Sequence, residues 1–276
     1  MKKNNLLLTL ILSLSVLEAS SCKTQTPAKD FINHVSRPYY IGHRGSKRGK
    51  HVENTRLAYS SGARAGYDGL ETDIRVSKDG QMFCFHDNDL TRLTYNKYDY
   101  DVNQKNFDEI KNIELYQTIN NIQLGPDTIC TFDDYLDICK KYDIVPIIEL
   151  KWTNGINDND FSNIPMLLKK IKDYGLEKQA FVMTSMKKCL EYIRDVDKDI
   201  HLQWLCSSNI TEGLEWAVDH EISIDVQYEH CTKEIVDYVH AHNLYINIWT
   251  LNDESKLKSF LDMGVDFITT DTLLEK

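Results

Sequence analysis

The 276-residue sequence lacks several motifs that define common classes of enzyme. Its seven cysteines form no C-x-x-C pair, which argues against a zinc ribbon or a thioredoxin-like redox motif. It contains no G-x-G-x-x-G loop and no G-x-S-x-G turn, so nucleotide-binding and serine-hydrolase functions lose support. Repeats of 20–50 residues and low-complexity segments are also missing, which leaves an ordinary globular domain.

The sequence has no excess of basic residues. Its net charge is −10, whereas a nucleic-acid partner favours a basic surface, so we expect no nucleic-acid binding. Hydrophobic residues make up 42% of the chain, which is enough for a large core. The roughly 240 residues from Tyr39 onward suit one large domain.

One apolar run lies near the N-terminus, and no later segment is apolar enough to cross a membrane. Lys2 and Lys3 precede the run Leu6–Leu17, which is too short to span a bilayer comfortably but fits the core of a secretory signal. The small residues Ala19–Ser21 then lead to Cys22. This arrangement resembles a bacterial lipoprotein signal, in which the cysteine after the cleavage site is acylated.

This N-terminus predicts an exported protein. We expect residues 1–21 to be a signal peptide, residues 22–38 to be a lipid-anchored linker and residues 39–276 to be the folded domain. The protein would then be a membrane-anchored lipoprotein of the periplasm or cell surface. The alternative is ordinary secretion, with Cys22 unmodified.

The domain alternates strand patterns with helix patterns, and eight of its strands can be parallel. The predicted parallel strands are Tyr39–Gly42, Gly69–Val76, Ile144–Leu150, Ala180–Thr184, His201–Leu205, Ile222–Val226, Leu244–Trp249 and Asp266–Thr269. The predicted helices are Thr55–Ala65, Phe132–Lys141, Phe161–Tyr174, Met186–Val196, Thr211–Asp219, Lys233–His242 and Glu254–Met263. This alternation predicts an α/β fold of the TIM (β/α)₈ barrel class.

Two segments stand outside this alternation. The strand Gln81–Phe85 follows the second parallel strand after only Ser77–Gly80, which is too short for a parallel crossover and suits an antiparallel hairpin. Residues 95–129 are polar and rich in asparagine, and they fit neither the helix nor the strand period. We therefore expect a hairpin after the second strand and an insertion at about 95–129.

Charged residues gather where the predicted strands end, which is the catalytic end of such barrels. Glu71 and Asp73 are two residues apart on one strand, so both side chains face the barrel interior. Buried carboxylates need a counter-charge, and Glu149 on the next strand offers a third oxygen ligand. An all-carboxylate set favours Mg²⁺, Ca²⁺ or Mn²⁺. The alternative is a buried ion-pair network with Arg44 and Lys151.

His43 and His86 are predicted to be an acid and base pair. An unperturbed imidazole pKa of about 6.5 suits proton transfer near neutral pH. Arg44 offers a bidentate fork for a phosphate, and Lys151 offers a point charge.

Three further residues are candidates for supporting roles. Asn54 suits the N-cap of the first helix, and Glu53 is a candidate for orienting the site at the first strand. Trp249 ends the seventh parallel strand, where it either lines the pocket or packs in the upper core.

These motifs together resemble the glycerophosphodiester phosphodiesterase family, in family order from the first strand to the last. The resembling segments are His43-Arg44-Gly45, Glu53-Asn54-Thr55, Gly69–Ile74, Lys78-Asp79-Gly80, His86-Asp87, Arg92–Thr94, Ile148–Lys151, Trp249–Asn252 and Gly264–Asp271. The resemblance implies hydrolysis of glycerophosphodiesters to glycerol phosphate and an alcohol. It also implies that His43 and His86 are acid and base, that Glu71, Asp73 and Glu149 hold the cation, and that Arg44 and Lys151 contact phosphate.

Two other functions stay open. A phosphatidylinositol-type phospholipase C shares the barrel and the two-histidine mechanism, and a non-catalytic surface binding module could use the same scaffold. The sequence does not decide the preferred alcohol, the cation, disulfides, the oligomeric state, or whether water or a substrate hydroxyl attacks.

Overall fold

The computed structural model of the chain describes residues 38–45, 51–208 and 210–272. The expected signal peptide, Cys22 and almost all of the expected linker lie outside the described residues, so those expectations stay predictions. In the described ranges, no helix has both the length and the hydrophobicity needed to cross a membrane.

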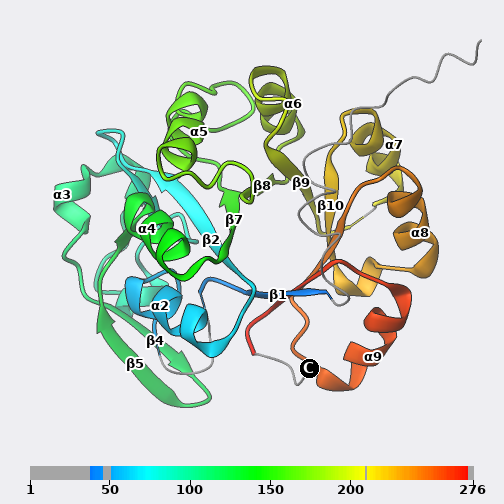
Figure 1. Cartoon of the computed structure of the whole chain (residues 1–276). Helices are drawn as coiled ribbons and strands as arrows, with labels where there is room; N and C mark the ends of the chain where they lie inside the picture. The colour runs from blue at the N-terminus through cyan, green and yellow to red at the C-terminus, as the bar shows by residue number, and fades with distance from the viewer. Residues whose placement is uncertain (1–37, 46–50, 209, 273–276) are drawn as a thin grey trace, which may run out of the picture.

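Eight parallel strands close into a barrel at the centre of the molecule (Figure 1). Pairing of the first and second strands completes the ring. In barrel order the strands are β1 (Tyr39–Gly42), β2 (Gly69–Val76), β7 (Val145–Leu150), β8 (Phe181–Thr184), β9 (His201–Cys206), β10 (Ser223–Gln227), β11 (Ile246–Trp249) and β12 (Phe267–Thr270). The structure confirms the predicted TIM barrel.

Helices surround the barrel, one after most of its strands (Figure 1). They are α2 (Arg56–Ala65), α4 (Phe132–Tyr142), α5 (Ile164–Asp173), α6 (Lys187–Val196), α7 (Thr211–Asp219), α8 (Lys233–Ala241) and α9 (Glu254–Met263). Each buries an apolar stripe against the strands; in α6 the stripe is Cys189, Leu190 and Ile193. Six cysteines, from Cys84 to Cys231, are buried and have free thiols.

The predicted N-cap of α2 is wrong by one residue. Thr55 has the extended backbone of a cap, and its side chain accepts a hydrogen bond from Ala58 N. Asn54 has a φ of 56°, which is incompatible with a cap, and its side chain turns towards β2. The difference matters because it frees the Asn54 amide for the candidate site.

The segment between β2 and α4 carries the predicted hairpin and insertion. Strand β3 (Met82–Cys84) pairs antiparallel with β2 and also with β6 (Cys130–Thr131). The insertion between them holds η1 (Arg92–Thr94), η2 (Val102–Gln104), α3 (Phe107–Ile110), β4 (Leu115–Ile119) and β5 (Ile122–Asp127). It has its own apolar cluster, and its β4–β5 hairpin lies outside the helical ring beside α2 (Figure 1).

An apolar cluster fills the lower part of the barrel interior. Its members come from four of the barrel strands and the adjoining Tyr245: Ile41, Val145, Ile147, Phe181, Met183, Tyr245 and Phe267. This packed floor leaves the open space of the barrel at the carboxyl ends of the strands.

Candidate active site

A cavity of about 460 Å³ of open space lies at the carboxyl ends of the barrel strands. Its lining joins residues that are far apart in sequence: His43, Arg44, Glu71, His86, Glu149, Lys151, Met183, Leu205, Asp225, Trp249 and Thr269. Seven of these are residues that the sequence analysis selected, including Trp249. Asp73 and Glu53 contact the lining residue Arg44 from behind, and Asn54 contacts Asp73.

Three carboxylates meet at one side of the cavity. Glu71, Asp73 and Glu149 each offer an oxygen atom within 4.8 Å of the others. Glu71 and Asp73 are buried on β2, and register pairing places Asp73 directly beside Glu149 on β7. The Glu71 Oε1 atom is buried without a hydrogen-bond partner among the described residues. This oxygen donor set fits a hard divalent cation.

Basic side chains already contact this cluster, so part of the alternative ion-pair network is present. Lys151 Nζ lies 2.5 Å from Glu149 Oε1 and 3.1 Å from Asp73 Oδ1. Arg44 Nε lies 3.4 Å from Asp73 Oδ2, but its NH1 group is shared with Glu53 at 2.7 Å. Lys151 thus contacts two of the three clustered carboxylates, and Arg44 divides its contacts between Asp73 and Glu53.

The pKa values of the three carboxyls reflect this imbalance. Burial and the neighbouring charges of Asp73 and Glu149 raise the pKa of Glu71 well above its usual value. Burial and Asp73 raise the pKa of Glu149 to about 7. Burial alone would raise the pKa of Asp73, but Lys151 and Arg44 hold it well below its usual range. Without a cation, Asp73 is thus the carboxyl that stays ionised.

The turn after β1 places Arg44 beside the carboxylate cluster by adopting an unusual backbone. Arg44 has a φ of 52°, and its N–H donates to Glu71 Oε2 at 2.7 Å. Gly45 follows with a φ of 97°, and a Cβ there would lie 2.9 Å from Ala58 Cβ. A non-glycine residue in the left-handed region costs free energy and occurs often at functional sites.

An aspartate holds the Nδ1 atom of each candidate catalytic histidine. His43 Nδ1 lies 2.8 Å from Asp271 Oδ1, and His86 Nδ1 lies 2.7 Å from Asp87 Oδ1. Such contacts fix the ring orientation and favour the tautomer with the proton on Nδ1. Both rings line the cavity.

Glu53 connects the two sides of the cavity. Its buried carboxylate accepts hydrogen bonds from Arg44 (2.7 Å), from Arg92 (2.6 Å) and from Gln117 Nε2 (2.5 Å). Arg92 in turn donates to Asp87 Oδ2 at 2.7 Å, so an ionic chain runs from Arg44 to the aspartate that holds His86. Gln117 belongs to β4, which ties the insertion to this chain.

Asn54 joins β2 to helix α2 rather than capping the helix. Its Nδ2 group donates to Asp73 Oδ2 at 2.7 Å, and its Oδ1 accepts from Tyr59 Oη at 2.8 Å. The hydrogen bond from the amide stabilises the ionised form of Asp73. Asn54 therefore supports the carboxylate cluster directly.

Arg75 is a buried residue of the site that the sequence analysis did not select. Its guanidinium donates to the His86 carbonyl at 2.6 and 3.2 Å and to the Trp152 carbonyl at 3.2 Å. These carbonyls belong to the two segments that carry His86 and Lys151. Arg75 follows Asp73 by two residues on β2 and so shares the strand face of Glu71 and Asp73, which was the signal that could have identified it.

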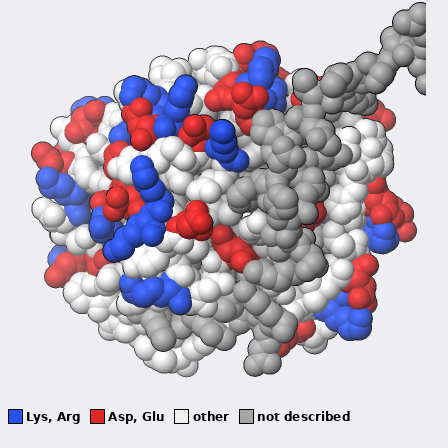
Figure 2. Space-filling model, in the orientation of Figure 1, with Lys and Arg blue, Asp and Glu red and all other residues white. Residues whose placement is uncertain are grey.

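Three more residues were missed although sequence signals existed. Asp271 and Arg92 stand in the segments that resemble the family, but no role was given to them. Asp225 occupies an inward position of β10 and lines the cavity. Elsewhere, acidic and basic side chains lie interspersed on the described part of the visible face (Figure 2).

Comparison with known proteins gives a consistent result. A profile of the Glycerophosphoryl diester phosphodiesterase family matches residues 43–275. A glycerophosphodiester phosphodiesterase from Bacillus altitudinis is 27% identical over 242 residues, covering 84% of this chain and 93% of the relative.

Solved structures share the fold. The structure of an Oleispira antarctica phosphodiesterase in complex with the product sn-glycerol-3-phosphate has a TM-score of 0.73 at 20% identity, covering 85% of this chain and 93% of that chain. A glycerophosphodiester phosphodiesterase from Parabacteroides distasonis ATCC 8503 has a TM-score of 0.67 at 22% identity, with 85% and 93% coverage. Because the family profile spans most of the chain, this protein belongs to the glycerophosphoryl diester phosphodiesterase family.

Proposed function

We propose that this protein hydrolyses glycerophosphodiesters to glycerol phosphate and an alcohol, using a divalent cation and two histidines. The observation that carries the proposal is the meeting of three carboxylates and two aspartate-held histidines in one cavity. Family membership and the product-bound Oleispira relative support the substrate class.

Glu71, Asp73 and Glu149 would hold the cation, because their oxygens converge and one of them lacks a partner. Mg²⁺, Ca²⁺ and Mn²⁺ all suit an oxygen-only donor set. When bound, such an ion polarises a phosphoryl oxygen and stabilises the charge that develops in the transition state.

His43 and His86 would exchange protons with the reacting oxygens. One ring takes a proton from the attacking oxygen while the other gives a proton to the leaving alcohol oxygen. Asp271 and Asp87 keep each ring in the tautomer and orientation that this exchange requires. The attacking oxygen is either water or a hydroxyl of the substrate, and a cyclic phosphate product distinguishes the second from the first.

Arg44 and Lys151 would bind the phosphate. Both line the cavity, and nearby carboxylates raise both pKa values despite burial, so both stay charged. The Arg44 guanidinium suits two phosphate oxygens, and Trp249 on the far wall offers an apolar surface to the organic part of the substrate.

The test is direct. The purified protein should release glycerol phosphate from glycerophosphocholine, glycerophosphoethanolamine, glycerophosphoglycerol or glycerophosphoinositol with Mg²⁺ or Ca²⁺, and should stop with EDTA. Release of inositol phosphate from intact phosphatidylinositol instead would favour the phospholipase alternative. Binding without turnover of any of these compounds would favour the non-catalytic module.

We propose further that the protein is exported and anchored through Cys22. The basic start, the apolar run and the small residues before Cys22 support this proposal. Cys22→Ala should release the protein from membranes in cell fractionation. Unchanged partitioning of that variant would contradict acylation at this residue.

A further inference from the structure

Asp225 is a buried acid in the cavity wall to which the mechanism above gives no role. Its side chain is 1% exposed, it lines the cavity, and its Oδ1 atom has no hydrogen-bond partner among the residues that the structure describes. It lies on β10, four strands from β2 in either direction around the barrel. Asp225 therefore faces the wall that carries Glu71 and Asp73.

The surrounding strand shows that Asp225 is not part of the ordinary core. Its neighbours Ile224 and Val226 point outwards into the main apolar cluster beneath the helices, so Asp225 points inwards by alternation. Burial and the charge of Glu149 raise the pKa of its carboxyl well above the usual value. An acid in such a place lowers the stability of the fold unless a ligand pairs with it.

Gln203 repeats this pattern on the adjacent strand β9. It is fully buried, and neither its amide nitrogen nor its amide oxygen has a partner among the described residues. It pairs in register with Ser223, two residues before Asp225, so it lies one step deeper on the same side of the barrel. On the next two strands the polar pair Asn247 and Thr269 is satisfied, because Asn247 Nδ2 donates to Thr269 Oγ1 at 2.9 Å.

The cavity separates two kinds of chemistry. One wall carries the carboxylate cluster with Arg44 and Lys151, which suit a cation and a phosphate. On the opposite wall, the Asp225 Oδ1 atom has no hydrogen-bond partner among the described residues, which suits hydroxyl groups that can both donate and accept. Asp225 is also one inward step deeper than Trp249, because Asp225 pairs with Asn247 and Gln227 pairs with Trp249.

We propose that Asp225, which lines the cavity above the buried Gln203, binds the hydroxyl groups of the glycerol portion of the substrate. The deep end of the cavity accepts this small, constant portion, while the variable alcohol leaves through the mouth past Trp249. The proposal rests on the proposed function, and it assigns Asp225 to substrate recognition rather than to phosphate or cation binding.

The experiment compares binding of two ligands by three variants. Calorimetry with Ca²⁺ present measures the affinities for glycerol 3-phosphate and for inorganic phosphate. Asp225→Leu should weaken glycerol 3-phosphate binding by about 10- to 100-fold and change phosphate binding by less than about twofold. Asp225→Asn should retain part of the affinity, since an amide still bonds to hydroxyls. Asp237→Asn, which removes an exposed carboxylate on α8, should change neither affinity.

Two further readouts separate recognition from a structural role. The melting temperature of ligand-free Asp225→Leu should rise, because an unpaired buried acid is removed; a structural acid would lower it. Asp225→Leu should hydrolyse bis(p-nitrophenyl) phosphate, which has no glycerol, within about threefold of the wild-type rate. Its hydrolysis of glycerophosphocholine should fall by a factor similar to its loss of glycerol 3-phosphate affinity.

Equal weakening of both ligands, or no change in either, would overturn the proposal. If the wild type binds glycerol 3-phosphate more tightly than phosphate but hydrolyses no diester, the proposed function fails. Glycerol recognition by Asp225 is then still decided by whether Asp225→Leu weakens glycerol 3-phosphate binding more than phosphate binding.

Discussion

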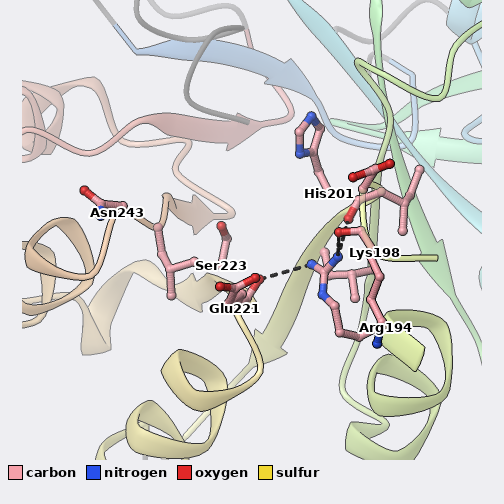
Figure 3. A pocket seen from close by; sticks show the side chains of 10 residues that line it. Arg194, Lys198, His201, Glu221, Ser223 and Asn243 are labelled. Carbon is pink, nitrogen blue, oxygen red and sulfur yellow. Dashed lines mark hydrogen bonds between the residues drawn. The ribbon is translucent and has the colours of Figure 1, made fainter. Parts of the chain in front are cut away.

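Two hollows, one at each end of the barrel, differ in how the polar groups that line them are paired. At the amino ends of β9, β10 and β11 a second, smaller hollow is lined by Arg194, His201 and Ser223 (Figure 3). Arg194 donates hydrogen bonds to the carbonyls of Lys198 and Glu221, at 2.9 and 3.1 Å, and to two more carbonyls nearby.

At the carboxyl end, by contrast, the cavity keeps polar atoms without partners. Glu71 Oε1 and Asp225 Oδ1 are buried there and lack hydrogen bonds among the described residues. Buried polar groups are nearly always paired in stable proteins, so exceptions that face a cavity point to a ligand. The amino end therefore stabilises the barrel, and the carboxyl end gives up stability for binding and catalysis.

Removing either histidine should produce the largest loss at the carboxyl end. His43→Gln and His86→Gln each lose a proton-transfer group, so kcat should fall by about 10²- to 10⁴-fold. The cation affinity should change little, because neither ring is a proposed ligand. Steady-state kinetics on glycerophosphocholine measure the effect, and retention of full kcat by both variants would contradict the assignment.

The free energy of unfolding should depend on pH because the buried carboxyl of Glu149 has a raised pKa. The pKa of Glu149 is about 7 in the fold, above its usual 4.5, so its folded form keeps a proton that the unfolded chain releases. Its contribution to stability is present below pH 4.5 and is lost as pH rises to about 7. In chelator-treated protein, wild type should lose about 2 to 3 kcal/mol relative to Glu149→Gln over that interval. Urea unfolding at both pH values measures it; parallel curves would contradict the shift.

A substitution at the amino end of the barrel should lower stability without lowering activity. Arg194→Met keeps the aliphatic stem but removes the donors to the backbone carbonyls, so the free energy of unfolding should fall by about 2 kcal/mol. The kcat/KM of the folded protein should not change. Arg64→Met, at an exposed arginine of α2, is the matched control and should have almost no effect on stability. A loss of kcat/KM in Arg194→Met would show that the two ends are not separate.

Arg92 tests the ionic chain behind His86 and should have the smallest effect. Burial raises the pKa of Asp87, but hydrogen bonds from His86 and Arg92 hold it below its usual value. Arg92→Met removes one of those donors, so the pKa of Asp87 should rise and the acidic limb of the pH–rate profile should move to higher pH. We expect about a tenfold loss of kcat at neutral pH. An unchanged profile would mean that Arg92 does not position His86.

Sequence reasoning located the barrel because its signals are local. Strand and helix periods recur with short connections, and the short Asp79-Gly80 turn excluded Gln81–Phe85 from the parallel set. The rule that chemistry lies at the carboxyl ends of the strands then selected the right residues for the cavity. The sequence predicted Asn54 as the N-cap of α2, whereas the cap is Thr55. The difference arises from the left-handed backbone of Asn54, which the sequence does not display.

The missed residues depend on contacts across long stretches of chain. Gln117 meets Glu53 across 64 positions, and nothing in the irregular insertion predicts that pairing. Asp225 could have been found, because an acid at an inward position of a barrel strand is as unusual as Glu71. It was overlooked because no motif surrounds it.

Cation binding tests the central claim most directly. Isothermal titration of the chelator-treated protein with Mg²⁺, Ca²⁺ and Mn²⁺ at neutral pH should show one ion bound per chain with release of protons, because the pKa of Glu149 is about 7 and a bound ion favours its ionised form. Glu71→Gln should abolish that binding, whereas Arg194→Met at the other end of the barrel should leave it unchanged. An absence of binding by the wild type, or binding that survives Glu71→Gln, would contradict the account.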